Sequence, residues 1–312
     1  MPKRKKRNSK KRIIWWIVGI LVILLVAGGG LAYSIYHSFD KNFEKTQVMH
    51  STEKRKKQVS LNHIDPVSIL LLGVDERKND KGRSDTIIVL TANPQSNDMK
   101  MVSIPRDTYT AIVGHGSIDK LNHAYAFGGI NMAADSVESL LNIPIDYVAE
   151  VNMEGFKELV DAVGGITVKN SLSFKQDQYE FPKGTITLDG NAALSYVRMR
   201  KQDPEGDFGR QNRQKQVISG ILKESASVKT LTNYNAIFNA LGKNVQTSLT
   251  LSDLNSLQKN YRKSISNIDQ ITFKKGQGET IDGIWYYKMN TKELDSVSKE
   301  LRKHLELPNS SN

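Results

Sequence analysis

Two short segments of this chain, 70–86 (LLLGVDERKNDKGRSDT) and 101–110 (MVSIPRDTYT), carry charged side chains that could bind a phosphorylated ligand. The first holds a separated pair of aspartates, and the second holds an arginine beside an aspartate. Two carboxylates can supply the one or two protein oxygens that typically hold magnesium, with phosphate and water completing its coordination. The residues concerned are Asp75, Asp85, Arg106 and Asp107.

The aspartates Asp75 and Asp85 also have a simpler interpretation as turn formers. Aspartate is common in turns because its side chain can hydrogen-bond the nearby backbone. Arg77 and Arg83 lie close enough in the sequence to neutralise them. In the ligand-binding interpretation these two arginines would instead contact a diphosphate, and both interpretations stay open here.

An arginine-rich segment, 195–217 (SYVRMRKQDPEGDFGRQNRQKQV), could complete such a site. Guanidinium groups bind phosphate in a bidentate manner. Three of the side chains fall at i, i+3 and i+4 and therefore on one face of a predicted helix. The alternative is a solvated helix whose arginines pair with Asp203, Glu205 and Asp207. A diphosphate best explains both clusters, and its ligands here would be Arg198, Arg200, Arg210, Arg213 and Gln214.

The elements that must position these residues follow an α/β pattern. Short β-branched runs predict strands, and helical periodicity with a closing glycine pair predicts helices. The predicted strands are 67–74, 85–91, 99–104, 145–151, ITVKN and TITLDG, and the predicted helices are 130–142, 153–165, 189–200 and 208–225, with a strand and a closing helix within 286–305.

Short connections decide where the charged residues meet. The ten residues 75–84 are too few for a helical crossover, so strand 85–91 should run antiparallel to strand 67–74. The turn 93–98 is short as well, and strand 99–104 should therefore return parallel to the first strand. This order brings Asp75, Asp85, Arg106 and Asp107 to one edge of the sheet, where α/β proteins commonly bind ligands.

The residues and motifs that several other enzyme classes require are absent from this sequence. The 312 residues include no cysteine, which excludes disulfides, cysteine zinc sites and thiol catalysis. The sequence contains no GxGxxG opening a helix, no GxxxxGK[ST], no GxSxG and no HExxH, and its six histidines are scattered. Dinucleotide, P-loop, serine-hydrolase and zinc-protease functions are therefore not predicted.

The net charge of +11 is concentrated near the amino terminus. Residues 1–12 hold eight basic residues, 13–57 hold six basic and three acidic ones, and 58–312 hold 30 of each sign. The predicted folded part is neutral, so no nucleic-acid partner is expected.

The basic residues precede a predicted membrane span. Residues 13–36 are 24 uncharged residues, enough to cross a bilayer as one helix. The basic flank predicts that 1–12 is a cytoplasmic tail, which makes this a single-pass, type II cell-membrane protein with an extracellular domain. A cleaved signal peptide is the alternative, although its apolar region is usually much shorter. We further predict a stalk at 37–66, one domain at 67–305 and a disordered tail at 306–312.

The order of these motifs resembles the LytR-CpsA-Psr family of bacterial cell-wall proteins. The resemblance covers 67–225 and includes KLNHAYAFGG (120–129) and VGGI. It implies a three-layer α-β-α sandwich with a mixed central sheet and a long apolar cavity for a polyprenyl chain. It also implies a magnesium-dependent phosphotransferase that moves an anionic polymer, such as wall teichoic acid, from polyprenyl diphosphate to the C6 hydroxyl of N-acetylmuramic acid in peptidoglycan.

The resemblance also implies roles for individual residues. Asp75 and Asp85 would bind Mg²⁺, and Asp85, Arg106 and Asp107 would be catalytic, with Asp107 acting as a general base or orienting the arginine. Asn122 and Tyr125 match a motif near the pocket. The expected diphosphate ligands are Arg77, Arg83, Arg106, Lys120, Arg198, Arg200, Arg210, Arg213 and Gln214.

Two other functions would use the same residues. A membrane-anchored regulator or carrier could bind the polyprenyl diphosphate without turnover, and a hydrolase could transfer its phosphoryl group to water. Loss of turnover with retained binding in a variant of a candidate base, Asp85 or Asp107, would distinguish an enzyme from a carrier.

Overall fold

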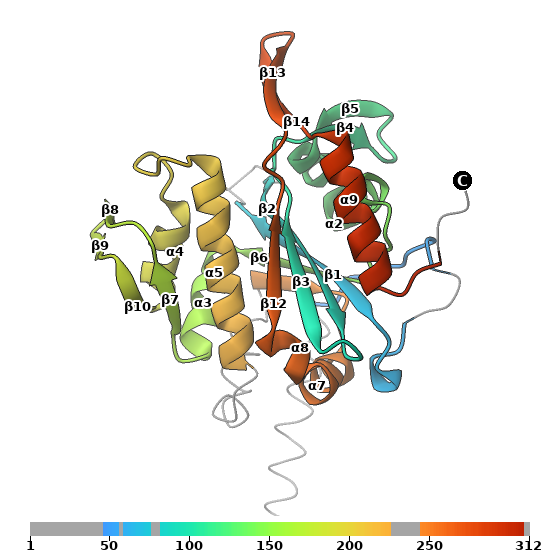
Figure 1. The fold of residues 1–312 in the computed structure, drawn as a ribbon, viewed down its shortest axis with the longest axis horizontal. Helices are drawn as coiled ribbons and strands as arrows, with labels where there is room; N and C mark the ends of the chain where they lie inside the picture. The colour runs from blue at the N-terminus through green and yellow to red at the C-terminus, as the bar shows by residue number, and fades with distance from the viewer. Residues whose placement is uncertain (1–45, 56–58, 76–81, 226–243, 309–312) are drawn as a thin grey trace, which may run out of the picture. The chain divides into compact units, whose positions relative to one another are not determined.

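The computed structural model describes residues 46–55, 59–75, 82–225 and 244–308 (Figure 1). The described residues belong to one compact unit, Lys45–Asn312. The predicted cytoplasmic tail and the predicted membrane span at 13–36 lie outside the described residues. Among the helices that the structure describes, none is both long and apolar enough to cross a bilayer.

A six-stranded mixed sheet forms the centre of the unit, with strand order β11-β6-β1-β2-β3-β12. β1 pairs antiparallel with β2 and parallel with β6, and β2 pairs antiparallel with β3. The antiparallel second strand and the returning third strand predicted from the short connections are therefore confirmed. The bounds are β1 (Val67–Val74), β2 (Ser84–Asn93), β3 (Asp98–Ser103), β6 (Tyr147–Asn152), β11 (Val245–Thr247) and β12 (Ile268–Thr272).

Helices cover both faces of this sheet, because its central strands are apolar on both sides. Leu70 and Leu72 belong to a core shared with α2 and α9, whereas Ile69 and Ile88 belong to a second core shared with α7 and α8. A mixed α/β fold around a central mixed sheet is thus confirmed (Figure 1). The helices are α2 (Leu121–Leu141), α7 (Leu251–Asn260), α8 (Arg262–Ser266) and α9 (Thr291–His304).

A third core lies beside the sheet, around two small two-stranded sheets. Its buried residues include Val160, Ile166, Tyr196 and Val217. Helix α5 lies between this core and the central sheet, since Val217 contacts one and Ile218 the other (Figure 1). The elements are α3 (Met153–Ala162), β7 (Ile166–Asn170), β8 (Phe174–Gln176), β9 (Tyr179–Phe181), β10 (Gly184–Leu188), α4 (Gly190–Arg198) and α5 (Asp207–Ser225).

Local signals explain where several helices begin and end. α3 begins after Asn152, whose side chain accepts a hydrogen bond from the Gly155 amide at 2.9 Å. It ends before Gly164 and Gly165, both at positive φ, as the glycine pair predicted. α2 begins nine residues earlier than expected, because a kink at Gly128–Gly129 interrupts its periodicity.

Two further hairpins project from the sheet edge at the top of Figure 1, and neither was predicted as a hairpin. β4 (Tyr109–Ile112) pairs with β5 (Ser117–Lys120), and β13 (Gln277–Ile281) pairs with β14 (Ile284–Lys288). The Tyr287 amide donates to the Asp107 carbonyl at 2.9 Å, so β14 is tied to the chain that follows β3.

The described part of the predicted stalk is folded against the domain. Arg55 forms an ion pair with Asp146, with Nε 2.7 Å from Oδ1, and donates to the Pro66 carbonyl at 2.9 Å. Leu61, in the short helix η1 (Leu61–His63), is buried in the core beneath α7. Residues 46–55 and 59–66 are therefore part of the domain rather than a solvated spacer.

The carboxyl-terminal residues are also more ordered than predicted. Leu307 contacts the core, and the Pro308 carbonyl accepts a hydrogen bond from Arg302 at 2.6 Å. Glu306 accepts a hydrogen bond from Asn93 at 3.2 Å. Residues 306–308 thus follow α9 onto the sheet, and the rest of the predicted tail lies outside the described residues.

The Arg55–Asp146 ion pair predicts a large effect on stability. Burial raises the pKa of the Asp146 carboxyl even though Arg55 and Ser68 favour its charged form. The Arg55→Ala variant would leave that carboxylate without its cation, and we expect it to lose about 3 kcal/mol of unfolding free energy, measured by urea denaturation. Lys54→Ala removes a neighbouring bond to the Glu138 carbonyl and should cost far less. Equal losses of unfolding free energy in the two variants would contradict the conclusion that residues 46–55 stabilise the domain through this ion pair.

Candidate functional site

A β-bulge sets the position of Asp85 at the sheet edge. Gly73 opposes Thr86, but Val74 opposes Ser84, which makes Asp85 an extra residue in the β1–β2 ladder. Bulges of this kind redirect a side chain and are common beside active sites. A Cβ atom on Gly73 would lie 2.9 Å from the Thr86 Cβ, so glycine allows the two strands to meet here.

The turn after β3 holds Arg106 and Asp107 rigidly. The Thr108 amide and hydroxyl both donate to the Pro105 carbonyl, at 3.0 and 2.6 Å. The Arg106 carbonyl accepts from the Asn122 amide at 3.1 Å, at the start of α2, while Asp107 is held by β14. A helix and a strand distant in sequence thereby fix both backbones.

Seven charged side chains meet at this edge, and we call them the charged cluster. Arg106 lies 2.8 Å from Asp85 and 3.4 Å from Asp107, and Lys120 lies 2.9 Å from Asp107. On α5, Arg210 lies 2.8 Å from Asp207, with Arg200 at 3.9 Å from the same carboxylate oxygen. The cluster is Asp85, Arg106, Asp107, Lys120, Arg200, Asp207 and Arg210.

Mutual electrostatic effects link the two halves of the charged cluster. Burial opposes the charged form of Arg106, but Asp85, Asp107 and Asp207 outweigh it and raise the pKa of the guanidinium. Burial lowers the pKa of Arg210, and repulsion from Arg106 adds to this effect despite Asp207. The charged cluster contains four cations and three carboxylates. One of the cations, Arg210, is buried in an environment that disfavours its charged form.

Two arginine nitrogens in the charged cluster have no acceptor. The Nε atoms of Arg106 and Arg210 are buried and donate no hydrogen bond. The Arg106 Nε lies 3.4 Å from the Asp107 Oδ2, and this ion pair lacks hydrogen-bond geometry. Buried donors of this kind are costly unless a ligand or water satisfies them. A multiply charged anion such as a diphosphate suits both the charge and the unsatisfied donors.

Asp75 and Asp85 lie at neighbouring strand ends, as the topology predicted. The Asp75 amide lies 3.4 Å from the Arg83 carbonyl, and Asp85 accepts from Arg106 through Oδ1. The ion pair of Asp85 is thus with Arg106 rather than with a residue of its own turn. Within the described residues, no group of three histidine or carboxylate side chains could hold a metal. Two carboxylates fit Mg²⁺ that takes its remaining ligands from water and phosphate.

Arg213 differs from the prediction, because its side chain is buried and fully engaged elsewhere. Its side chain is 6% exposed and forms an ion pair with Asp203, which is 7% exposed. Its other donors reach the Tyr196 and Met199 carbonyls. Gln214, one residue later, instead donates to Thr86 at 2.8 Å on the sheet. Because α5 lies between two layers, Arg213 and Gln214 face different layers. The contacts of Arg213 make it a structural residue.

The remaining predicted site residues are divided among three locations. Arg198 is exposed and contacts the Met153 sulfur, and Arg83 is exposed immediately before β2. Tyr125, a residue of α2, lies in the core, and Asn122 on the same helix is buried with its Oδ1 lacking a partner. Arg77 lies outside the described residues.

Asp207 belongs to the charged cluster, although the sequence patterns indicated it only as a possible ion-pair partner of the nearby arginines. It lies in the first turn of α5 and contacts Arg200, Arg210 and Gln211. Its i, i+3 spacing from Arg210 is the signal that could have identified it. The carboxylate holds both arginines beside Arg106.

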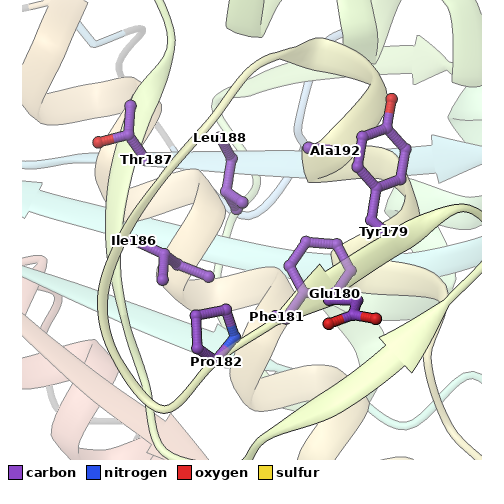
Figure 2. Close-up of a pocket in the computed structure, with 8 residues that line it drawn as sticks. All are labelled: Tyr179, Glu180, Phe181, Pro182, Ile186, Thr187, Leu188 and Ala192. Carbon is purple, nitrogen blue, oxygen red and sulfur yellow. The ribbon is translucent and has the colours of Figure 1, made fainter.

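A separate cavity of about 330 Å³ lies in the third core, against β9, β10 and α4 (Figure 2). Polar and apolar atoms contribute about equally to its walls, and it shares no lining residue with the charged cluster. The long apolar cavity implied by the family resemblance stays a prediction. The lining residues are Tyr179, Glu180, Phe181, Pro182, Ile186, Thr187, Leu188 and Ala192.

Comparison with known proteins identifies the family. Residues 33–303 match the model of the LytR_cpsA_psr family. The chain belongs to the LytR-CpsA-Psr family. The polyisoprenyl-teichoic acid–peptidoglycan teichoic acid transferase TagU of Bacillus cereus is 50% identical to this LytR-CpsA-Psr protein over 279 residues, covering 88% of this chain and 92% of TagU.

Solved structures of LytR-CpsA-Psr proteins share the fold. The crystal structure of B. subtilis TagU is 45% identical, with a TM-score of 0.65 over 79% of this chain and all of that chain. The structure of TagT bound to LIIa-WTA is 34% identical, with a TM-score of 0.70 over 83% of this chain and 97% of that chain.

The structural role of Arg213 predicts a loss of stability on its removal. Arg213→Ala would leave Asp203 buried without its cation, and we expect a loss of about 3 kcal/mol in unfolding free energy, measured by urea denaturation. Arg200→Ala is the matched control, because that side chain is 56% exposed and should change stability by less than about 1 kcal/mol. A stable Arg213→Ala protein would return this residue to the list of candidate ligands.

Proposed function

We propose that this protein transfers an anionic glycopolymer of the wall teichoic acid type from a polyprenyl diphosphate carrier to peptidoglycan. The observation that carries the proposal is the charged cluster, with its four cations and two unsatisfied arginine donors. The family membership and the name of the 50% identical relative support the same transferase chemistry.

The reaction is a phosphoryl transfer. A peptidoglycan hydroxyl, proposed to be the C6 hydroxyl of N-acetylmuramic acid, attacks the phosphorus that carries the polymer, and a new P–O bond forms. The bridging P–O bond breaks, and polyprenyl phosphate leaves with the electron pair. The hydroxyl proton passes to a carboxylate of the site. Atoms and charge balance without a further reactant.

The chain's own residues stabilise the charge that develops on the phosphate oxygens. Arg106 and Arg210 are fixed by Asp85 and Asp207 before a substrate arrives, so little reorganisation is needed during the reaction. Lys120 and Arg106 both contact Asp107, which keeps the Arg106 side chain in place. Positioning and electrostatics are the main sources of catalysis in phosphoryl transfers.

Arg106 should be essential for this chemistry. We expect Arg106→Ala to lower the transfer rate by roughly 10²- to 10³-fold, the usual loss when one preorganised donor is removed. The assay uses the full-length protein in nanodiscs with a polyprenyl diphosphate-linked sugar, a peptidoglycan oligomer and magnesium, and mass spectrometry detects the phosphodiester product. Arg262→Ala, an exposed arginine on α8, is the control. Near wild-type transfer by Arg106→Ala would refute the assignment.

The same assay distinguishes the proposed transferase from the two other functions. Polyprenyl phosphate and sugar phosphate released without a joined product would indicate a hydrolase. Binding without any product would indicate a carrier or regulator. Asp85→Asn and Asp107→Asn test the proton acceptor, because its loss removes turnover while substrate binding persists, whereas loss of a magnesium ligand at Asp85 would weaken diphosphate binding as well.

We further propose that Asp75 and Asp85 hold Mg²⁺, which would supply a Lewis acid that neutralises diphosphate charge. Asp75→Asn should then require a roughly tenfold higher magnesium concentration for half-maximal transfer, because one anionic ligand is lost. Isothermal titration with Mg²⁺ and inorganic pyrophosphate measures the binding directly. An unchanged magnesium titration in this variant would count against the ligand role.

We propose that the predicted span at 13–36 anchors the protein to the cell membrane with the catalytic domain outside the cell. A polyprenyl carrier is confined to the membrane, so an anchored enzyme would meet it at high local concentration. Residues 46–55 contact the domain, so few residues of sequence separate the predicted span from the domain.

A further inference from the structure

The β13–β14 hairpin exposes an indole ring to solvent. Trp285 is 50% exposed, the highest exposure of any aromatic side chain among the large hydrophobic residues of the described chain. A Cβ atom on Gly278 would lie 2.6 Å from the indole Nε1 and 3.0 Å from two ring carbons. The nitrogen-bearing side of the ring therefore lies close to the Gly278 backbone of β13, and half of the side chain stays exposed to solvent.

The face of the β13–β14 hairpin that carries Trp285 leads towards the charged cluster. Tyr287 lies two residues along β14 on that face, and a Cβ atom on Gly276 would lie 2.5 Å from its Cζ. Tyr287 packs edge-on against Phe208 at 6.0 Å between ring centroids, next to Asp207. The Tyr287 amide bonds the Asp107 carbonyl, and two strand residues span about 7 Å. Trp285 is thus about one sugar length from the strand position that contacts Asp107.

We propose that Trp285 is a stacking platform for a hexose ring of the acceptor glycan, a deduction that rests on the proposed function. The C–H face of a pyranose is apolar and weakly positive, and it complements the negative face of an indole. A sugar held on this face would direct the neighbouring sugar of the same chain along β14 towards Asp107. The platform would give the site its preference for an extended glycan over a free hydroxyl compound.

The surroundings of Trp285 favour a saccharide over a lipid surface. The turn of the hairpin carries Asp282, and Glu279 forms an ion pair with Lys288 at 2.7 Å. Insertion into a bilayer would bring these carboxylates against anionic headgroups at a cost. Ile284, 48% exposed, points to the opposite face of the strand, so the two apolar side chains do not form one insertion surface.

A fluorescence titration tests the platform directly. The chain contains three tryptophans, so Trp15→Phe and Trp16→Phe in the full-length protein leave Trp285 as its only indole. This protein, in nanodiscs, is titrated with the tetramer of N-acetylglucosamine and with a soluble peptidoglycan oligomer. We expect a saturable change in emission with both glycans and none with inorganic pyrophosphate.

Variants measure how much the platform contributes. In the wild-type background, Trp285→Ala should raise the KM for the peptidoglycan oligomer roughly tenfold, the loss expected for one aromatic stack. Trp285→Tyr should retain most of the affinity. Gly278→Ala keeps the indole, but its new Cβ atom would displace the ring from β13. This variant should therefore also weaken glycan binding. Ile284→Ala, which removes a side chain of similar exposure from the other face, should leave the KM unchanged.

The outcomes separate this inference from the proposed function. Wild-type transfer with an unchanged KM in Trp285→Ala would overturn the platform alone. An absence of transfer would overturn the proposed function, while the emission titration would still decide whether the indole binds glycan. An emission shift between phosphatidylcholine and phosphatidylglycerol nanodiscs, with no response to either glycan, would assign the hairpin to the membrane and overturn the platform.

Discussion

The ion pair between Arg106 and Asp85 is the contact on which the arrangement of the site depends. Arg106 follows β3, Asp85 sits in the bulge of β2, and their 2.8 Å contact joins two strand ends. The backbone of the same turn is held by α2 and β14, so four segments distant in sequence meet there. A partly buried charge requires a partner, and here the side chains at two neighbouring strand ends supply that partner for each other.

Helix α5 contributes both to the third core and to the charged cluster because it lies between two layers. Arg213 faces the third core and satisfies Asp203, Tyr196 and Met199, whereas Arg210 faces the sheet edge and pairs with Asp207. The two arginines are three residues apart and have the same chemical nature. Because each faces a different layer, Arg213 stabilises the fold and Arg210 belongs to the charged cluster.

Much of the central fold follows from local patterns. The apolar runs gave the central strands to within two residues, and the short loops 75–84 and 93–98 permitted only antiparallel returns. The β4–β5 and β13–β14 hairpins were not predicted, since their strands are short and carry mixed polar residues. The stalk prediction was wrong for its described part because a polar composition does not reveal one buried ion pair, Arg55 with Asp146.

The sequence by itself determined the strand order that brings Asp75, Asp85, Arg106 and Asp107 to one edge, because chain connectivity limits how short loops can return. It also supplied the family resemblance that the comparisons confirmed. Only the tertiary structure decided which arginines face that edge, that Asp207 holds Arg200 and Arg210 there, and that Lys120 reaches Asp107. These contacts depend on how separate layers are oriented, and helical spacing alone does not define which neighbour each face meets.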